Sequence, residues 1–92
     1  MEFEWDSAKA ESNLRKHEVP FDEAETVFGD PYAVTFDDPD HSDEEPRYII
    51  FGHSLRARLL TVCYTERRGK IRIISARRSA PWERRVYGQG QE

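Results

Sequence analysis

The residues of this sequence that could do chemistry are concentrated in one segment near its end. Positions 70 to 85 read KIRIISARRSAPWERR, in which six of the sixteen residues are Lys or Arg. Alternation of Ile with Arg is typical of a half-buried strand, but it does not account for Arg77, Arg78, Arg84 and Arg85. Arginine suits phosphate, because its planar guanidinium donates two hydrogen bonds at once and stays charged at any useful pH.

A single acidic residue, Glu66, lies beside these cations, and it is the only Asp or Glu between positions 46 and 82. Cleavage of RNA without a metal requires a base for the 2′-hydroxyl, cations for the growing phosphate charge, and an acid for the leaving 5′-oxygen. Glu66 among arginines is consistent with the first two of these requirements, the base and the cations. The alternative is an ion pair of Glu66 with Arg67 or Arg72, since structural ion pairs gather the same residue types.

A turn at Arg68–Gly69 would place these side chains on a hairpin. Cross-strand partners then sum to 137, which gives the pairs Tyr64–Ile73, Val62–Ser75, Glu66–Ile71 and Arg67–Lys70. In this register one face is an apolar row that ends at Glu66 and at Arg77. The opposite face carries Thr65, Arg67, Arg72 and Arg78.

Charge is divided unevenly along the chain. Residues 1–55 carry 4 Lys and Arg against 15 Asp and Glu, whereas residues 56–87 carry 10 against 2. The overall net charge of −4 therefore conceals a strongly basic C-terminal part. This asymmetry predicts a basic surface for a polyanion, unless the two halves neutralise each other across the fold.

The rest of the chain must hold the hairpin in place, and its pattern predicts one α+β domain over residues 1–92. We expect a strand at 3–5, helices at 8–17 and 20–28, strands at 33–36, 47–52, 58–65 and 71–76, and a helix at 81–87. Short links favour an antiparallel meander, with helices on one sheet face and the other face free to bind. Residues 88–92 are expected to fray.

On the first helix, three- and four-residue spacing predicts a polar stripe of Lys9, Asn13, Lys16 and His17, with Ala10 and Leu14 facing inward. His17 lies at the C-terminal end of this helix, and this position favours an interaction of its side chain with the helix dipole over a contact with RNA.

The sequence predicts neither a cofactor nor a metal site. Cys63 is the only cysteine, so no internal disulfide can form, which fits a reducing cytoplasm. The group of His41 with Asp38, Asp40 and Asp43 has the spacing of neither a zinc nor a calcium site. Every apolar run is far shorter than the roughly 20 residues of a membrane span, so we expect a cytoplasmic protein without membrane contact.

Motifs along nearly the whole chain resemble the BrnT toxin family, the toxin half of a bacterial type II toxin–antitoxin pair. From Phe3 to Tyr87 they read FEWDSAKAESNLRKHEVPFDEAETVFGDP, DPDHSDEEPRYIIFGHS, YTERRGKIRIISARR and ERRVY. The resemblance implies a RelE-like fold, with two N-terminal helices packed on an antiparallel sheet of three to four strands and a C-terminal helix. It also implies a ribonuclease that inhibits translation, neutralised by a BrnA-type antitoxin with a ribbon-helix-helix DNA-binding part, in a toxin–antitoxin heterotetramer.

Residue by residue, the resemblance assigns catalysis to the hairpin. The TER segment gives Glu66 and Arg67, and the IRIISAR segment gives Arg72 and Arg77. Arg72 and Arg77 are expected to hold the scissile phosphate, with Glu66 as base or orienting group and Arg67 steadying the transition state. Further RNA contacts are expected from Lys9, Asn13, His17, Lys70 and Arg78, although the first three could instead orient the sheet.

The sequence departs from the family pattern in two places. Family members often have Gly after the helix-ending His, and Glu18 at that position should tolerate a left-handed backbone poorly, so the helix end is expected to differ. The segment Ala80-Pro81-Trp82 replaces a more basic start of the last helix, which reduces the RNA contacts expected there.

The alternative function is a non-catalytic basic module that binds an antitoxin or RNA.

Overall fold

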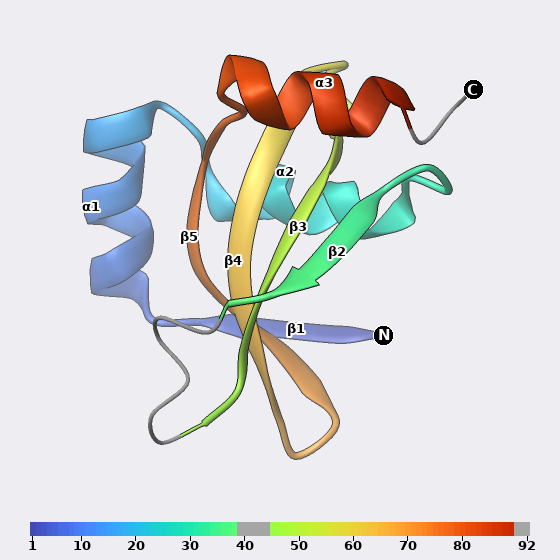
Figure 1. Cartoon of the computed structure of the whole chain (residues 1–92). Helices are drawn as coiled ribbons and strands as arrows, with labels where there is room; N and C mark the ends of the chain where they lie inside the picture. Colours follow the sequence, from blue (N-terminus) through green and yellow to red (C-terminus); the bar gives the residue numbers. More distant parts are fainter. Residues whose placement is uncertain (39–44, 90–92) are drawn as a thin grey trace.

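The computed structural model describes residues 1–38 and 45–89, and Figure 1 shows its elements. The helices are α1 (Ser7–His17), α2 (Phe21–Thr26), the short 3-10 helix η1 (Val27–Gly29) and α3 (Pro81–Gln89). The strands are β1 (Glu2–Trp5), β2 (Val34–Asp37), β3 (Arg47–His53), β4 (Leu59–Arg67) and β5 (Lys70–Arg78). The α+β prediction is confirmed. Helix α3 includes the first two residues of the end expected to fray and continues through Gln89, and residues 90–92 lie outside the described residues.

The strands form one five-stranded sheet in the order β1-β5-β4-β3-β2. Strands β2 to β5 are antiparallel neighbours, as predicted for the meander. The sheet is nevertheless larger than the three or four antiparallel strands expected, because β1 adds to its edge and runs parallel to β5. A parallel neighbour needs a crossover, and here the rest of the chain between β1 and β5 supplies it.

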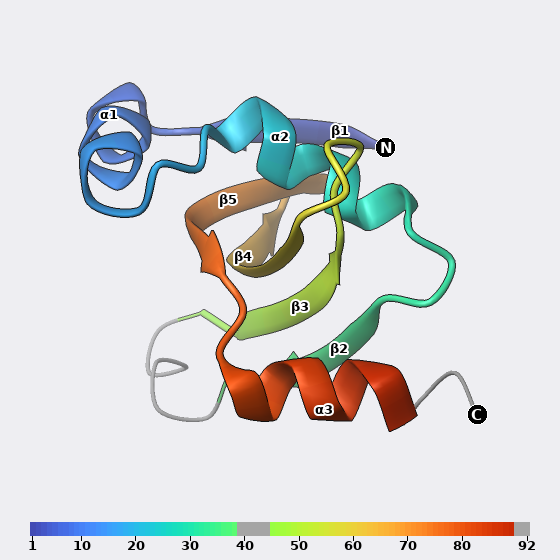
Figure 2. The same cartoon turned by 90° about the horizontal axis from the view of Figure 1, so that it is seen from above.

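Helices cover both faces of the sheet rather than one, as Figure 2 shows. Helices α1 and α2 lie on one face, which we call the helical face. Helix α3 lies across one end of the other face, where the Trp82 ring packs 5.7 Å from that of Phe51. The prediction of a wholly free second face is therefore wrong, and among the described residues no helix covers its end near the β4–β5 turn. We call this area, which includes Arg67, Lys70 and Arg72, the open face.

The hydrophobic core lies between the helical face and α2. It combines residues of α2 and its flanks with inward residues of the three central strands: Val19, Phe21, Ala24, Val27, Ile50, Leu60, Val62, Tyr64, Ile71, Ile73 and Ala76. The Phe28 ring bridges Phe3 and Tyr64, with ring centroids 5.1 and 4.9 Å away. Each fully buried Val, Leu, Ile or Phe side chain contributes about 1.5–3 kcal/mol, so this core is what fixes the orientation of β5.

The β4–β5 hairpin has the predicted turn but a different register at its far end. Arg68 and Gly69 have φ angles of 52° and 78°, which suits a two-residue turn. The pairs from Tyr64 to Lys70 match the prediction, but a β-bulge shifts the register between Cys63 and Tyr64. Val62 consequently pairs with Ala76 instead of Ser75.

The bulge exchanges the faces predicted for two arginines. Arg77 pairs with Thr61 and therefore lies on the side that α3 covers, whereas Arg78 pairs with Leu60 on the helical face. A pleated strand alternates its side chains, so one extra residue reverses every assignment beyond it.

Helix α1 begins at a side-chain cap and ends in left-handed geometry. Asp6 accepts hydrogen bonds from the N–H groups of Ala8 and Lys9, at 2.8 and 3.2 Å. Glu18 has φ 57° and donates its N–H to the Leu14 carbonyl, so the helix ends as it would with glycine, contrary to expectation. None of the described helices is long and apolar enough to cross a membrane.

Candidate functional site

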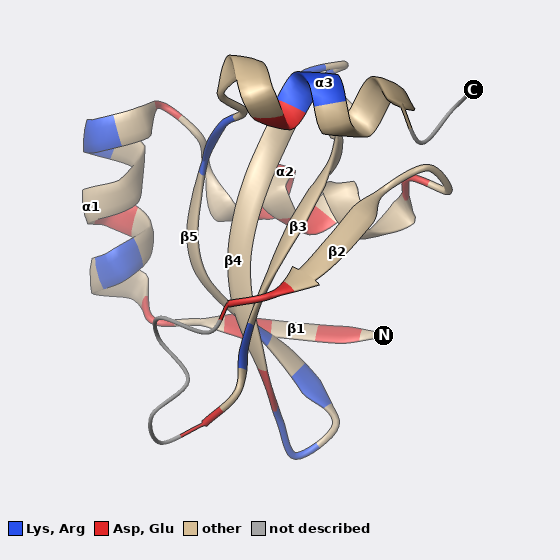
Figure 3. Ribbon diagram, viewed as in Figure 1, with Lys and Arg blue, Asp and Glu red and all other residues tan. Residues whose placement is uncertain are grey.

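Basic side chains gather on the open face around the β4–β5 turn. Arg67 pairs with Lys70 and Arg72 pairs with Thr65, so the three cations point to the same side of the sheet. Figure 3 shows blue Lys and Arg segments around this hairpin turn, and others on α1, on α3 and at the far end of β5. The structure thus brings together two of the four predicted catalytic residues, Arg67 and Arg72, with one predicted RNA contact, Lys70.

Each of these three cations is met by a carboxylate from the acidic half of the chain. Arg67 binds Glu45 through two guanidinium nitrogens, at 2.9 Å from Nε and 2.8 Å from Nη2. Arg72 Nη1 lies 2.9 Å from Oε2 of Glu4, and Lys70 Nζ lies 3.7 Å from Glu2. The hydrogen bond from Arg67 lowers the pKa of Glu45. The two halves of the chain therefore do neutralise each other at this surface.

Glu66 does not lie with these cations. It pairs with Ile71 and faces the helical side beside Tyr64, where its charge adds to the effect of burial in raising the pKa of the Tyr64 hydroxyl. The alternative ion pair of Glu66 with Arg67 or Arg72 is not formed either, because both arginines bind other carboxylates.

A carboxylate that sequence reasoning missed takes the place expected for Glu66. Glu4 lines a pocket of about 440 Å³ together with Arg67, Arg68 and Lys70. Its signal in the sequence is the alternation Glu2-Phe3-Glu4-Trp5, which puts both carboxylates on the face opposite the two aromatic rings. The pocket thus combines one carboxylate with three cationic side chains.

Arg77 lies further along β5 and holds α3 to the sheet. Its two terminal nitrogens bind the two carboxylate oxygens of Glu83 at 2.7 and 2.8 Å. The Glu83 side chain is 1% exposed and that of Arg77 is 43% exposed. Burial raises the pKa of Glu83, but hydrogen bonds from Arg77, the Ala80 N–H and Thr61 outweigh it and lower the pKa overall. Arg77 lies five positions beyond Arg72 on β5, about 16 Å along the strand, so the two are poorly placed to hold one phosphate.

Asn13, a predicted RNA contact, is a buried structural residue. Strand β1 pairs with β5 only as far as Ile73, which leaves the backbone edge of β5 beyond it without a strand neighbour. Asn13 fills this place: its Nδ2 donates to the carbonyls of Ala76 and Val19, at 2.8 and 3.0 Å, and its Oδ1 accepts from the Ala76 N–H at 3.1 Å. The residue therefore orients the sheet, which was the alternative left open.

The polar stripe predicted on α1 is displaced accordingly. Asn13 is 6% exposed and Leu14, which was expected to face inward, is 46% exposed. Lys9 and His17 are exposed, and His17 lies in the basic last turn of the helix. Arg78, the remaining predicted RNA contact, lines a separate pocket with His53, Arg58, Arg84 and Tyr87.

Within residues 1–38 and 45–89, no group of three or more His, Cys, Asp or Glu side chains could hold a metal ion. The group considered around His41 lies largely outside the described residues. Burial, followed by the charge of Asp38, raises the pKa of the Cys63 thiol.

Comparison with known proteins decides the family. The family model described as "Ribonuclease toxin, BrnT, of type II toxin-antitoxin system" matches residues 5–83. The chain belongs to the BrnT family. The crystal structure of the Brucella abortus ribonuclease toxin BrnT has a similar fold, with a TM-score of 0.68 and 23% identity over 87% of this chain and 97% of that chain. No curated protein matches the sequence. The resemblance seen in the motifs is thus confirmed for this BrnT-family chain.

Proposed function

We propose that this BrnT-family chain is a metal-independent endoribonuclease whose RNA substrate lies on the open face of the β4–β5 hairpin. The observation that carries the proposal is the pocket in which Glu4 lies among Arg67, Arg68 and Lys70, with Arg72 bonded to the same carboxylate. General acid–base groups and guanidinium groups are what a metal-free cleavage of RNA requires from a protein.

In this mechanism Arg67 and Arg72 hold the scissile phosphate by paired hydrogen bonds, and Lys70 adds a point charge. Glu4 replaces Glu66 as the base and takes the proton of the 2′-hydroxyl. The 2′-oxygen attacks phosphorus, the bond to the 5′-oxygen breaks, and the leaving 5′-oxygen takes a proton from solvent water, so that the products are a 2′,3′-cyclic phosphate and a 5′-hydroxyl. Arg77, fixed by Glu83, contacts a neighbouring phosphate instead of the scissile one.

RNA must displace the carboxylates that hold the open-face cations. The pairs of Arg67 with Glu45 and of Lys70 with Glu2 are partly exposed, and exposed ion pairs of this kind contribute little to stability. Phosphate oxygens can therefore replace them at small cost. The same ion pairs neutralise Arg67 and Lys70 until RNA arrives, which favours recognition of a phosphate that fits over general attraction to polyanions.

We further propose that cleavage of RNA inhibits translation, and that a BrnA-type antitoxin with a ribbon-helix-helix DNA-binding part neutralises the chain in a heterotetramer. The type II toxin–antitoxin family supports a protein antitoxin. A simple way to neutralise this site is to cover the open face, where an antitoxin would compete with RNA for Arg67 and Arg72.

The alternative is that the same surface binds an antitoxin or RNA without turnover. To separate the two, purified chain free of antitoxin is incubated with naked RNA in EDTA, beside an Arg72→Gln variant and an Arg85→Gln control on α3. Cleavage by the parent and the control, but not by Arg72→Gln, is the expected result. Salt-dependent RNA binding with no cleavage by any of the three, also when translating ribosomes are added, would establish the binding module instead.

A further inference from the structure

A second group of cations lies at the opposite end of the sheet from the hairpin turn. A pocket of about 490 Å³ is lined by Arg58, Arg78 and Arg84, together with His53 and Tyr87. Strand β4 runs from this pocket to the hairpin turn, a distance of about 26 Å from Leu59 to Arg67. Only Arg78 among these five was predicted to contact RNA.

The charges of this pocket differ from those of the open face. Arg58 is neutralised, because its Nε lies 2.9 Å from the buried carboxylate of Glu23. In contrast, neither Arg78 nor Arg84 forms an ion pair with any carboxylate that the structure describes. No Asp or Glu is among the described residues that line the pocket. It thus offers two guanidinium groups to an anion without a carboxylate to displace.

Hydrogen bonds fix which ring nitrogen of His53 carries a proton. The Tyr87 hydroxyl donates its one proton to Oδ2 of Asp30, at 2.6 Å. His53 Nδ1 lies 3.0 Å from the same hydroxyl, so Nδ1 must carry the hydrogen that fills this contact. Asp30 can serve as the acceptor because hydrogen bonds from Tyr87 and from backbone N–H groups outweigh burial and lower its pKa. In the neutral ring, Nε2 is then the hydrogen-bond acceptor.

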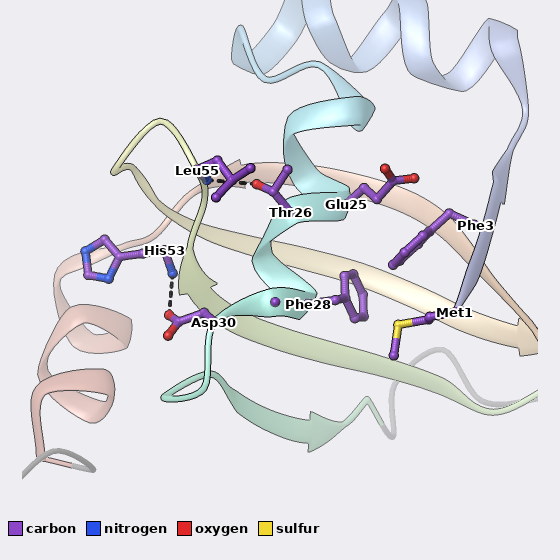
Figure 4. Close-up of a pocket in the computed structure, with 9 residues that line it drawn as sticks. Met1, Phe3, Glu25, Thr26, Phe28, Asp30, His53 and Leu55 are labelled. Carbon is purple, nitrogen blue, oxygen red and sulfur yellow. Dashed lines mark hydrogen bonds between the residues drawn. The ribbon is translucent and has the colours of Figure 1, made fainter.

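The position of the ring is fixed as well. The backbone N–H of His53 donates to Oδ2 of Asp30 at 2.8 Å, and the ring packs edge-on against Tyr87 with centroids 5.0 Å apart. Figure 4 shows the ring turned away from the neighbouring apolar pocket near Phe3 and Phe28, on the side of α3. An oriented acceptor therefore lies in the same pocket as two unpaired arginines.

We propose that this pocket is a ribonucleotide subsite that holds a phosphate with Arg78 and Arg84 and accepts the adjacent ribose 2′-hydroxyl at Nε2 of His53. The 2′-hydroxyl is the group by which a protein distinguishes RNA from DNA. The inference rests on the proposed function in taking RNA as the ligand. It extends the RNA site from the hairpin turn, past Arg77, to the far end of β5, and adds a second place, away from the cleaved bond, where RNA is distinguished from DNA.

The test uses adenosine 3′-monophosphate and its 2′-deoxy analogue, neither of which has an internucleotide bond to cleave. Each is titrated into the ¹⁵N-labelled chain, and the imidazole nitrogens of His53 are followed by NMR. We expect Nδ1 to be protonated in the free chain and the ¹⁵N chemical shift of Nε2 to change on binding. The affinity should be about fivefold higher for the ribonucleotide, which corresponds to the free energy of one neutral hydrogen bond.

Matched variants separate the two roles. His53→Phe keeps the ring against Tyr87 but removes both nitrogens, and should abolish the difference between the two nucleotides. Arg84→Gln and Arg78→Gln should weaken both nucleotides equally, whereas Arg85→Gln, which lies outside the pocket lining, should not. Tyr87→Phe removes the hydroxyl that fixes the tautomer, so the ¹⁵N shifts of His53 should change.

Equal affinity of the parent for the two nucleotides, or Nδ1 unprotonated in the free chain, would overturn the subsite. Cleavage of RNA measured in parallel distinguishes this outcome from failure of the proposed function. A chain that prefers the ribonucleotide but cleaves no RNA keeps the subsite and loses the nuclease. A chain that cleaves RNA without this preference does the reverse.

Discussion

The burial of Asn13 leads to a prediction whose size follows from the structure. Replacing it with Ala removes three hydrogen bonds and leaves three backbone groups of Val19 and Ala76 without a partner. An unsatisfied buried polar group costs about 1–3 kcal/mol, and because water can enter part of the space, we take about 1 for each. The expected loss of unfolding free energy is therefore about 3 kcal/mol. For a domain of this size that lowers Tm by roughly 15 °C.

The assay is thermal and urea unfolding followed by circular dichroism, with Lys16→Ala as a control on the exposed side of the same helix. The control should change the unfolding free energy by less than about 0.5 kcal/mol. A loss below about 1 kcal/mol for Asn13→Ala would refute the view that this amide completes the edge of β5.

Asn13→Asp sharpens the test, because it keeps the acceptor for the Ala76 N–H but turns a carboxylate toward two carbonyl oxygens. Burial and those oxygens should raise the pKa of the introduced carboxyl in the folded state. A raised folded pKa favours the folded state at low pH. The variant should thus be less stable than Asn13→Ala at pH 7 and recover as the pH falls toward 4, whereas an Asn13→Ala loss has no such recovery.

Three further predictions follow from single contacts. Glu83→Gln should lower the unfolding free energy by about 2 kcal/mol at pH 7, a partial loss because Arg77 is partly exposed. The pKa of Glu83 is lowered in the folded state, so the greater stability of the wild type should be lost as the pH falls from about 4.5 through the folded pKa. Acid unfolding curves of the two proteins measure this loss. Glu18→Gly should raise the unfolding free energy by about 1 kcal/mol, because Glu18 holds a left-handed backbone; a loss would show that its side chain contributes more than the strain. Glu45→Gln should free Arg67 and tighten RNA binding severalfold at low salt in fluorescence anisotropy, and unchanged affinity would argue against Arg67 as an RNA contact.

The parts of the fold that could be predicted are those set by local pattern. Alternating Ile and Arg predicts β5, Arg68-Gly69 predicts the turn, and Pro20 predicts the start of α2, all of which the structure confirms. The bulge near Tyr64 leaves no local mark, because either register keeps most apolar side chains buried. The faces of Arg77 and Arg78 could not be assigned for that reason.

The candidate site could be predicted only in part, because a cluster of cationic residues is visible in the sequence, whereas the carboxylates that lie beside it in the fold are not. The arginines of the hairpin were found from composition, but Glu4 lies more than sixty residues from Arg72 in the chain and meets it only because β1 adds to the sheet in parallel. Asn13 looks like a surface residue until the unpaired edge of β5 is known. Such residues depend on long-range pairing, which periodicity within one segment does not encode.

The most direct test of the account compares two carboxylates on opposite faces of the hairpin region. Single-turnover cleavage of naked RNA in EDTA is measured for the parent, Glu4→Gln and Glu66→Gln, each checked for fold by circular dichroism. If Glu4 is the base, Glu4→Gln should slow cleavage by about 100-fold or more and Glu66→Gln should stay within a few fold of the parent. A large loss for Glu66→Gln with normal cleavage by Glu4→Gln would contradict the assignment of catalysis to the open face.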